Sequence, residues 1–166
     1  MEPRSKYFIS FPIINRNADS KVDAESDHWL NLNAFAARLL ASQVLDLSLY
    51  AIWAMRDALE MPLEGIKPEV RDQTLRAAAL WIEFCGENLH GMEKLWESDP
   101  RKGDVARGGL LYSGPKGFCE ERWELWRQRF GALSQDNKLE EKTRQALTDV
   151  ASWMSMVWFS TSINVV

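Results

Sequence analysis

Apolar residues recur every three or four positions along most of this chain. That spacing places them on one face of an α-helix, whereas the alternation typical of a strand occurs only near the N-terminus. The pattern predicts an all-α fold, a single-domain bundle of about five helices. We expect the bundle to span residues 26–158, between an extended N-terminal arm at residues 1–25 and an uncharged C-terminal tail at residues 159–166.

Residues suited to helix ends place the first two helices. Ser26 or Asp27 can cap a helix that runs to about Ser42. Asp46 can cap a second helix, which ends before Met61 and Pro62.

The other three helices flank a long loop. Pro68 opens a third helix at a position where proline is tolerated, and the apolar face of this helix continues to Leu95. Residues 98–117 follow, and they hold five of the nine glycines, too many for a stable helix. This Gly-rich loop is either a lid over a cavity or a disordered connector. A fourth helix starts at about Phe118 and a fifth near Lys138.

Composition and charge narrow the class of protein. With 46% apolar and 27% charged residues, the 166-residue chain is expected to form a globular domain. The formal net charge of −4 argues against a partner such as nucleic acid or an anionic membrane, which clustered Lys and Arg would attract. Gln43 and Asp46 interrupt the longest apolar stretch, so no membrane span is expected. The short apolar run near the N-terminus contains Pro12 and lacks a cleavage pattern of small residues, which predicts a cytoplasmic protein.

The chain contains few of the residues that bind metals and cofactors, with two cysteines and two histidines. The two cysteines, Cys85 and Cys119, form no CxxC motif and are expected to be reduced thiols. The two histidines, His28 and His90, each follow a glutamate by three positions, a spacing found in di-iron bundles. In a bundle of alternating helices they would lie at opposite ends, too far apart to share a metal pair. The chain also lacks the motifs of nucleotide-binding loops and nucleophile elbows, so we expect no metal and no cofactor.

Charged side chains on apolar helix faces are the candidate catalytic groups. Arg56 lies on such a face one turn before Glu60, so it either pairs with Glu60 or anchors an anion or carbonyl group. The same alternatives apply to Arg38. Asp57 and Glu83 are the carboxylates best placed for proton transfer, with a solvated or paired role as the alternative.

Tryptophan is unusually frequent, with eight residues. Six fall on inward helix faces: Trp29, Trp53, Trp81, Trp123, Trp126 and Trp153. Indole rings at these positions either fill the core or line a cavity for a bulky apolar ligand. The candidate ligand contacts are Trp53, Trp81, Trp123, Trp126, Tyr50, Tyr112, Asn33 and Asn88. The two asparagines have hydrogen bonds between helices as an alternative role.

Four segments occur in an order that resembles a known family. They are Asn31-x-Asn33-Ala-Phe-Ala-Ala-Arg38, Tyr50-Ala-Ile-Trp-Ala-Met-Arg-Asp-Ala-Leu-Glu60, Ala77-Ala-Ala-Leu-Trp-Ile-Glu83, and the Gly-rich loop followed by Arg122-Trp-x-x-Trp126. Over about residues 26–150, the chain resembles an uncharacterised family of ascomycete fungal proteins with a domain of unknown function. The resemblance implies an all-helical fold, a fungal source and, for some members, genes that lie among those of secondary-metabolite biosynthesis. It supplies no catalytic residues.

Two functions fit these observations. The first is a cofactor-independent cyclase or isomerase, with a pericyclase such as a Diels–Alderase as one form, acting on an apolar fungal metabolite. Arg56 or Arg38 would polarise a carbonyl group, Asp57 would move a proton and the tryptophans would shape the substrate. The alternative is a non-catalytic interaction module whose apolar arm and tail pair with a second copy to form a homodimer. A pocket of roughly 300 Å³ or more between helices, lined by several of these tryptophans and with an unpaired arginine at its wall, would favour the enzyme, and a solid core would favour the module.

Overall fold

The computed structural model describes residues 21–98, 101 and 103–163, and it describes the side chains of residues 21–26 and 158–163 no further than their place in a helix. Its five helices are α1 (Lys21–Ala41), α2 (Ser48–Leu59), α3 (Pro68–His90), α4 (Glu120–Leu133) and α5 (Glu141–Ile163). Within the described ranges no strand occurs, and a single β-bridge joins Leu95 to Gly117. The predicted all-α fold with five helices is confirmed.

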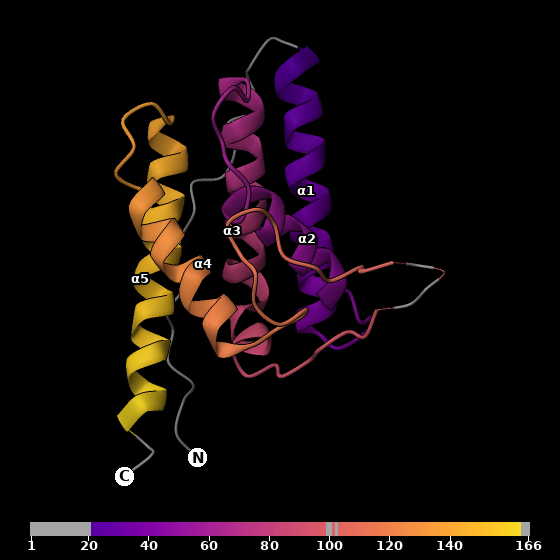
Figure 1. The fold of residues 1–166 in the computed structure, drawn as a ribbon. Coiled ribbons are helices and arrows are strands. Elements are labelled where there is room, and N and C mark those ends of the chain that lie inside the picture. The colour runs from indigo at the N-terminus through magenta and orange to yellow at the C-terminus, as the bar shows by residue number, and fades with distance from the viewer. Residues whose placement is uncertain (1–20, 99–100, 102, 164–166) are drawn as a thin grey trace, which may run out of the picture.

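Helix α3 lies at the centre of the arrangement (Figure 1). It packs against α1 on one side and α5 on the other, while α2 crosses it and α4 lies across α5 (Figure 1). Helices α1 and α3 run in the same direction, since Asn33 contacts Trp81 and Arg38 contacts Phe84 further along both helices. This parallel course of α1 and α3 is the one expected of a bundle whose successive helices alternate in direction.

Some helix ends differ from those predicted. Helix α1 begins at Lys21, before the predicted cap at Ser26, and residues 1–20 of the predicted arm lie outside the described residues. Helix α3 ends at His90 rather than continuing to Leu95. The predicted tail is helical up to Ile163, and its last three residues also lie outside the described part.

Two aspartates bind backbone groups near helix starts. The Asp46 carboxylate accepts hydrogen bonds from the backbone N–H and the hydroxyl of Ser48, the first residue of α2. The Lys94 ammonium and the Ser48 bonds hold the pKa of Asp46 at about 2. Asp72 of α3 is buried and accepts from the backbone N–H of Glu140 at 2.9 Å, just before α5. Helix α5 starts at Glu141, directly after this contact and three residues after the predicted start near Lys138.

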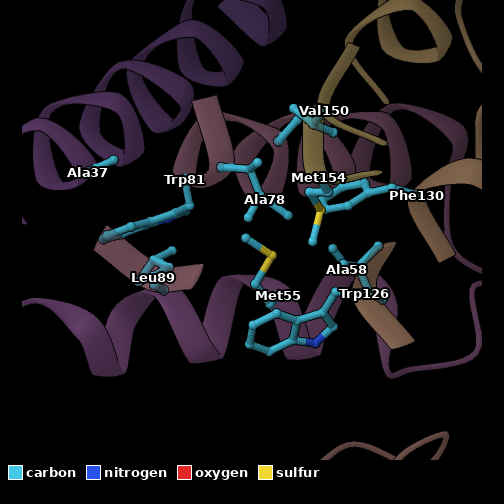
Figure 2. Packing of buried hydrophobic residues seen from close by; sticks show 14 of the residues in the cluster. Ala37, Met55, Ala58, Ala78, Trp81, Leu89, Trp126, Phe130, Val150 and Met154 are labelled. Atoms are coloured by element: carbon cyan, nitrogen blue, oxygen red, sulfur yellow. The ribbon is translucent and has the colours of Figure 1, made fainter. Parts of the chain in front are cut away.

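The core runs along α3 and is filled by large side chains from four helices (Figure 2). Trp81 of α3, Met55 of α2, Trp126 and Phe130 of α4 and Met154 of α5 are each at most 1% exposed. Burial of a side chain of this size contributes about 1.5–3 kcal/mol to folding. Trp81 and Trp126 are therefore part of a packed interior.

One predicted inward tryptophan faces outward. Trp29 is 50% exposed, because α1 turns Leu30, Ala34 and Ala37 toward α3 instead. The small side chains of the two alanines let the helices approach closely. The prediction that Trp29 faces the core was wrong.

A buried ion pair ties the connection between α3 and α4 to the bundle. Glu60, just after α2, and Arg122 of α4 are both fully buried, with Nε of Arg122 2.6 Å from Oε1 of Glu60. A second bond joins Nη2 of Arg122 to Oε2 of Glu60 at 3.0 Å. Trp126 donates its indole N–H to Oε1 at 2.7 Å, and the backbone N–H of Gly109 donates to Oε2 at 2.8 Å. Of the two roles that the sequence left open for Arg56, the pairing with Glu60 is not the one formed, because Glu60 turns toward Arg122 across the core and Arg56 pairs with Asp57.

The remaining donors of Arg122 bind backbone carbonyls of the same connection. Nη1 donates to the carbonyl oxygens of Ala106 at 2.9 Å and Gly117 at 3.0 Å, and Nη2 donates to that of Arg107 at 3.2 Å. The ring of Tyr112 lies 4.9 Å from the guanidinium carbon. These bonds fix residues 106–117 to the interior, in contrast to the lid or disordered connector that the sequence suggested.

The helices of the described ranges are not of the kind that spans a membrane. None of these helices combines the length and the apolar character that crossing a bilayer requires.

Candidate functional site

Helix α3 is interrupted near its C-terminal end. Cys85 has φ −139° and ψ 19°, outside the helical region, although residues on both sides of it are helical. Its thiol donates to the carbonyl oxygen of Trp81 at 3.0 Å, one turn earlier, which explains a local break in the backbone hydrogen-bond pattern. Burial raises the pKa of Cys85 to about 12, so this cysteine is an unreactive thiol.

A groove of about 480 Å³ lies beside this break. One wall is α3 itself, and the others come from the end of α1 and the middle of α5. The lining residues are Ala41, Ile82, Glu83, Phe84, Cys85, Gly86, Glu87, Asn88, Val150 and Trp153. We call this space the α3 groove. Its volume is in the range of small-molecule sites.

Gly86 shapes the floor of the α3 groove. A Cβ atom at this position would lie 2.6 Å from the ring of Trp153, closer than packed atoms allow. Glycine therefore lets the indole of Trp153 lie against the α3 backbone. Trp153 in turn contacts Trp123 edge-on, with ring centroids 6.4 Å apart.

Glu83 is a carboxyl group with a raised pKa in the lining of the α3 groove. Burial raises its pKa from the ordinary 4.5 to about 7, while Arg38 lowers it and the nearby Asp149 raises it further. The carboxyl group is consequently poised to give up or accept a proton near neutral pH. A raised carboxyl pKa inside a cleft is a feature of functional sites.

Arg38 comes to this region through the parallel packing of α1 and α3. Its guanidinium carbon lies 3.8 Å from the centroid of the Phe84 ring, a cation–π contact next to Glu83. The charge of Arg38 acts on the Glu83 carboxyl. The lining of the α3 groove thus includes the carboxyl groups of Glu83 and Glu87 and the apolar side chains of Ile82, Val150 and Trp153, and Arg38 lies beside it against Phe84.

The structure gathers only part of the predicted site. Asn88 lines the α3 groove, and Arg38 lies next to it. Asn33 instead accepts the indole N–H of Trp81 at 2.9 Å inside the core and donates to the Trp29 carbonyl oxygen. This is the interhelical hydrogen bond that the sequence left as an alternative.

The predicted residues of α2 form a separate group. Nε of Arg56 lies 3.0 Å from the carboxylate of Asp57, whose side chain is 58% exposed. Tyr50 and Trp53 contact edge to face at 5.1 Å, and the Trp53 indole donates to the carbonyl oxygen of Val105 at 2.7 Å. None of these side chains lines the α3 groove.

The remaining predicted ligand contacts, Tyr112, Trp123 and Trp126, lie at the N-terminal half of α4. Trp126 binds Glu60, and the Tyr112 ring stacks near Arg122 while its hydroxyl group lies 3.1 Å from Sγ of Cys119. Trp123 is buried, 4% exposed, and contacts His90 edge to face. The Arg-Trp-x-x-Trp segment therefore builds the interior and holds the connection between helices.

The two histidines lie apart. His28 is exposed near the start of α1, whereas His90 ends α3, and the two helices are parallel. Burial lowers the pKa of His90, which favours its neutral form. Across residues 21–98, 101 and 103–163, no group of three His, Cys, Asp or Glu side chains is arranged to hold a metal ion.

A family described as "Protein of unknown function (DUF3632)" matches residues 5–130 of the chain. The chain belongs to the DUF3632 family. No curated protein and no solved structure matches it significantly. The DUF3632 match includes α1 to α3 and nearly all of α4, and with them Arg38, Glu83 and Arg122. Val150 and Trp153, on the α5 side of the groove, lie beyond the matched residues.

Two features of this DUF3632 protein were not foreseen. Arg122 as partner of Glu60 could have been suspected, since an arginine on an inward helix face must be paired. The contribution of Trp153 to a groove had no signal, because it depends on a break in α3 and on a glycine opposite the ring.

Proposed function

We propose that this DUF3632 protein is a cofactor-independent isomerase or cyclase that binds an apolar ketone or related carbonyl compound in the α3 groove. The observation that carries the proposal is the placement of Glu83 in a groove of about 480 Å³ with largely apolar walls and Arg38 beside it. This volume exceeds the roughly 300 Å³ at which small-molecule pockets begin, while Trp153 is the one tryptophan among the described residues of its lining and Arg38 contacts Phe84 beside it rather than lining it.

Glu83 would transfer the proton in this reaction. Its ionised carboxylate removes a proton from the carbon next to the carbonyl group, and the protonated carboxyl group returns it at another carbon. A pKa of about 7 suits both steps, because the group then exchanges protons at little cost near neutral pH. The proposal assigns this role to Glu83 rather than Asp57, since Asp57 is mostly exposed and paired with Arg56.

Arg38 and Asn88 would donate hydrogen bonds to the carbonyl oxygen of the substrate. Removal of the proton leaves negative charge on the carbonyl oxygen, and a guanidinium or amide donor stabilises that charge. Trp153, Val150 and Ile82 would hold the apolar part of the molecule in the reactive conformation.

The resemblance of the sequence to a fungal family also suggests a biological setting for this activity. The substrate would be an apolar fungal secondary metabolite, and the enzyme would work in the cytoplasm. The charge balance of the chain and the few basic clusters in its sequence are consistent with a small-molecule partner.

Hydrogen–deuterium exchange on a probe ketone tests proton transfer without knowledge of the natural substrate. The probe is 2-methyl-1-tetralone in D₂O, and NMR follows the loss of its α-proton. We expect the protein to accelerate this exchange and Glu83→Gln to lower the acceleration by about 100-fold or more.

A matched control separates the role of Glu83 from general effects. Glu69→Gln removes an exposed carboxylate in the first turn of the same helix, far from the groove, and should leave the exchange rate unchanged. Equal rates for the wild type and Glu83→Gln would rule out Glu83 as the proton-transfer group. An exchange rate with the wild type no higher than in buffer would contradict the proposed proton-transfer activity.

A second candidate function is a non-catalytic dimerisation module. The observation that favours it is the outward row of large apolar side chains on α1, with Trp29 50%, Leu32 56% and Phe35 58% exposed. Sedimentation equilibrium over a range of concentrations tests it: a homodimer that Leu32→Glu dissociates would support the module, and a monomer throughout would exclude it.

A further inference from the structure

The charged side chains in the lining of the α3 groove are acidic. Glu83 and Glu87 contribute carboxyl groups, and none of the described residues that line the groove is a lysine, an arginine or a histidine. Arg38 lies beside the groove, with its guanidinium group against the ring of Phe84. The walls of the groove therefore offer negative charge and apolar surface to a ligand.

The two glutamates of the groove lack partners in the described part of the chain. Neither Glu83 nor Glu87 has a hydrogen bond or an ion pair there, and Arg38 acts on Glu83 only through its charge. By contrast, the carboxylates of Glu60 and Glu124 bind arginine side chains. Two unpaired carboxyl groups thus line one cavity, where they leave room for a positive charge from a ligand.

A third acidic group, Asp149 of α5, adds to the negative charge beside the groove. Its carboxylate accepts a hydrogen bond from the side-chain amide of Gln145 at 2.9 Å. Burial and the charge of Asp149 raise the pKa of Glu83 to about 7, although Arg38 lowers it. A cation in the groove would offset both effects, since it stabilises the ionised form of Glu83.

Aromatic rings complete the surface that a cation would meet. The indole ring of Trp153 lines the groove, and indole is the side chain whose face attracts cations most strongly. The guanidinium carbon of Arg38 lies 3.8 Å from the centroid of the neighbouring Phe84 ring, so one cation already lies against a ring at this edge. Aromatic rings are the surfaces that recognise organic ammonium ions in proteins.

We infer that the α3 groove takes an organic cation, an apolar molecule that carries a protonated or quaternary amine. The ammonium group would pair with Glu87 near the indole ring of Trp153, and the apolar part would lie along Ile82 and Val150. The inference rests on the proposed function, because it makes the substrate of the same groove a basic aminoketone. The carbonyl part of that molecule remains for Glu83.

A matched pair of probes measures the contribution of the positive charge. Benzyltrimethylammonium and neopentylbenzene have the same shape, and they differ in whether a nitrogen cation or a carbon atom joins the three methyl groups to the benzyl group. NMR titration of the full ¹⁵N-labelled chain gives both dissociation constants, and Trp153→Phe assigns the indole signal that should shift. We expect the ammonium compound to bind about tenfold more tightly or better.

Two glutamine variants locate the binding site. Glu87→Gln should weaken the binding of benzyltrimethylammonium by about threefold to tenfold and leave that of neopentylbenzene unchanged. Glu69→Gln is the matched control, since it changes the net charge equally in the first turn of the same helix and should have no effect on either probe. Equal affinities for the two probes, or equal losses for the two variants, would overturn the inference.

These titrations do not depend on proton transfer, so they separate this inference from the proposed function. Preferential binding of the ammonium compound without accelerated exchange on 2-methyl-1-tetralone would support the organic cation and contradict the isomerase. Accelerated exchange together with equal affinities for the two probes would support the isomerase and overturn the organic cation.

Discussion

Replacing Glu60 by glutamine would remove the negative charge that pairs with the buried guanidinium of Arg122. An uncompensated buried charge costs about 3–5 kcal/mol in the free energy of unfolding. The amide group of glutamine would also turn donors toward the donors of Trp126, Gly109 or Arg122, which now all bind the carboxylate. For a domain of this size, we expect the melting temperature to fall by about 6–20 °C.

Urea unfolding followed by circular dichroism gives the free energy for this comparison. Asp57→Asn is the matched control, since it breaks the exposed ion pair with Arg56 and should change stability by less than about 1 kcal/mol. In a double-mutant cycle, Glu60→Gln combined with Arg122→Met should cost less than the sum of the single substitutions. A loss for Glu60→Gln no larger than for Asp57→Asn would refute the view that this pair holds the interior together.

Two further predictions concern the α3 groove. Gly86→Ala should destabilise the protein by about 1–3 kcal/mol in urea unfolding, because its Cβ would collide with the Trp153 ring. Gly91→Ala is the control and should have little effect, since no atom lies within 4 Å of the added Cβ. Equal losses of stability for the two variants would contradict the close approach at Gly86. The folded pKa of Glu83, about 7, lies above its ordinary 4.5, so the folded state binds more protons between these values and Glu83 makes stability fall as pH rises from about 4.5 to 7. Glu83→Gln should remove that part of the pH dependence in urea unfolding, and identical profiles for the two proteins would contradict it.

The sequence predicted well the helices whose signals lie within the helix itself or next to its ends. Helices α2 to α4 arise from apolar residues three and four positions apart and from residues such as Asp46 and Pro68 at their starts. Helix α5 starts at Glu141 rather than near Lys138, and the hydrogen bond from Glu140 to Asp72 just before it joins residues 68 positions apart, which a local pattern does not reveal. The face of α1 was misjudged at Trp29, since alanines and not the larger ring provide its contact surface.

Candidate residues were harder to place than helices. Glu60 has Arg56 as a neighbour one turn away, yet its partner Arg122 is 62 residues distant in the chain. Periodicity shows that a charge faces inward, but it carries no information on which opposite charge meets it across the core. Glu83 was recognised as a carboxylate suited to proton transfer, whereas its raised pKa depends on burial and on charges from α1 and α5.

The bonds of Arg122 also have a consequence for how the molecule opens. The backbone N–H groups of Gly109 and Leu111 donate to the carboxylate and the carbonyl oxygen of Glu60, and these acceptors are buried with the ion pair. The segment that contains Gly109 and Leu111 therefore cannot open independently of the helices, in contrast to most surface loops. Its protected amide protons should exchange with solvent only when α2 and α4 separate, so that a segment without regular secondary structure belongs to the same cooperative unit as the helices.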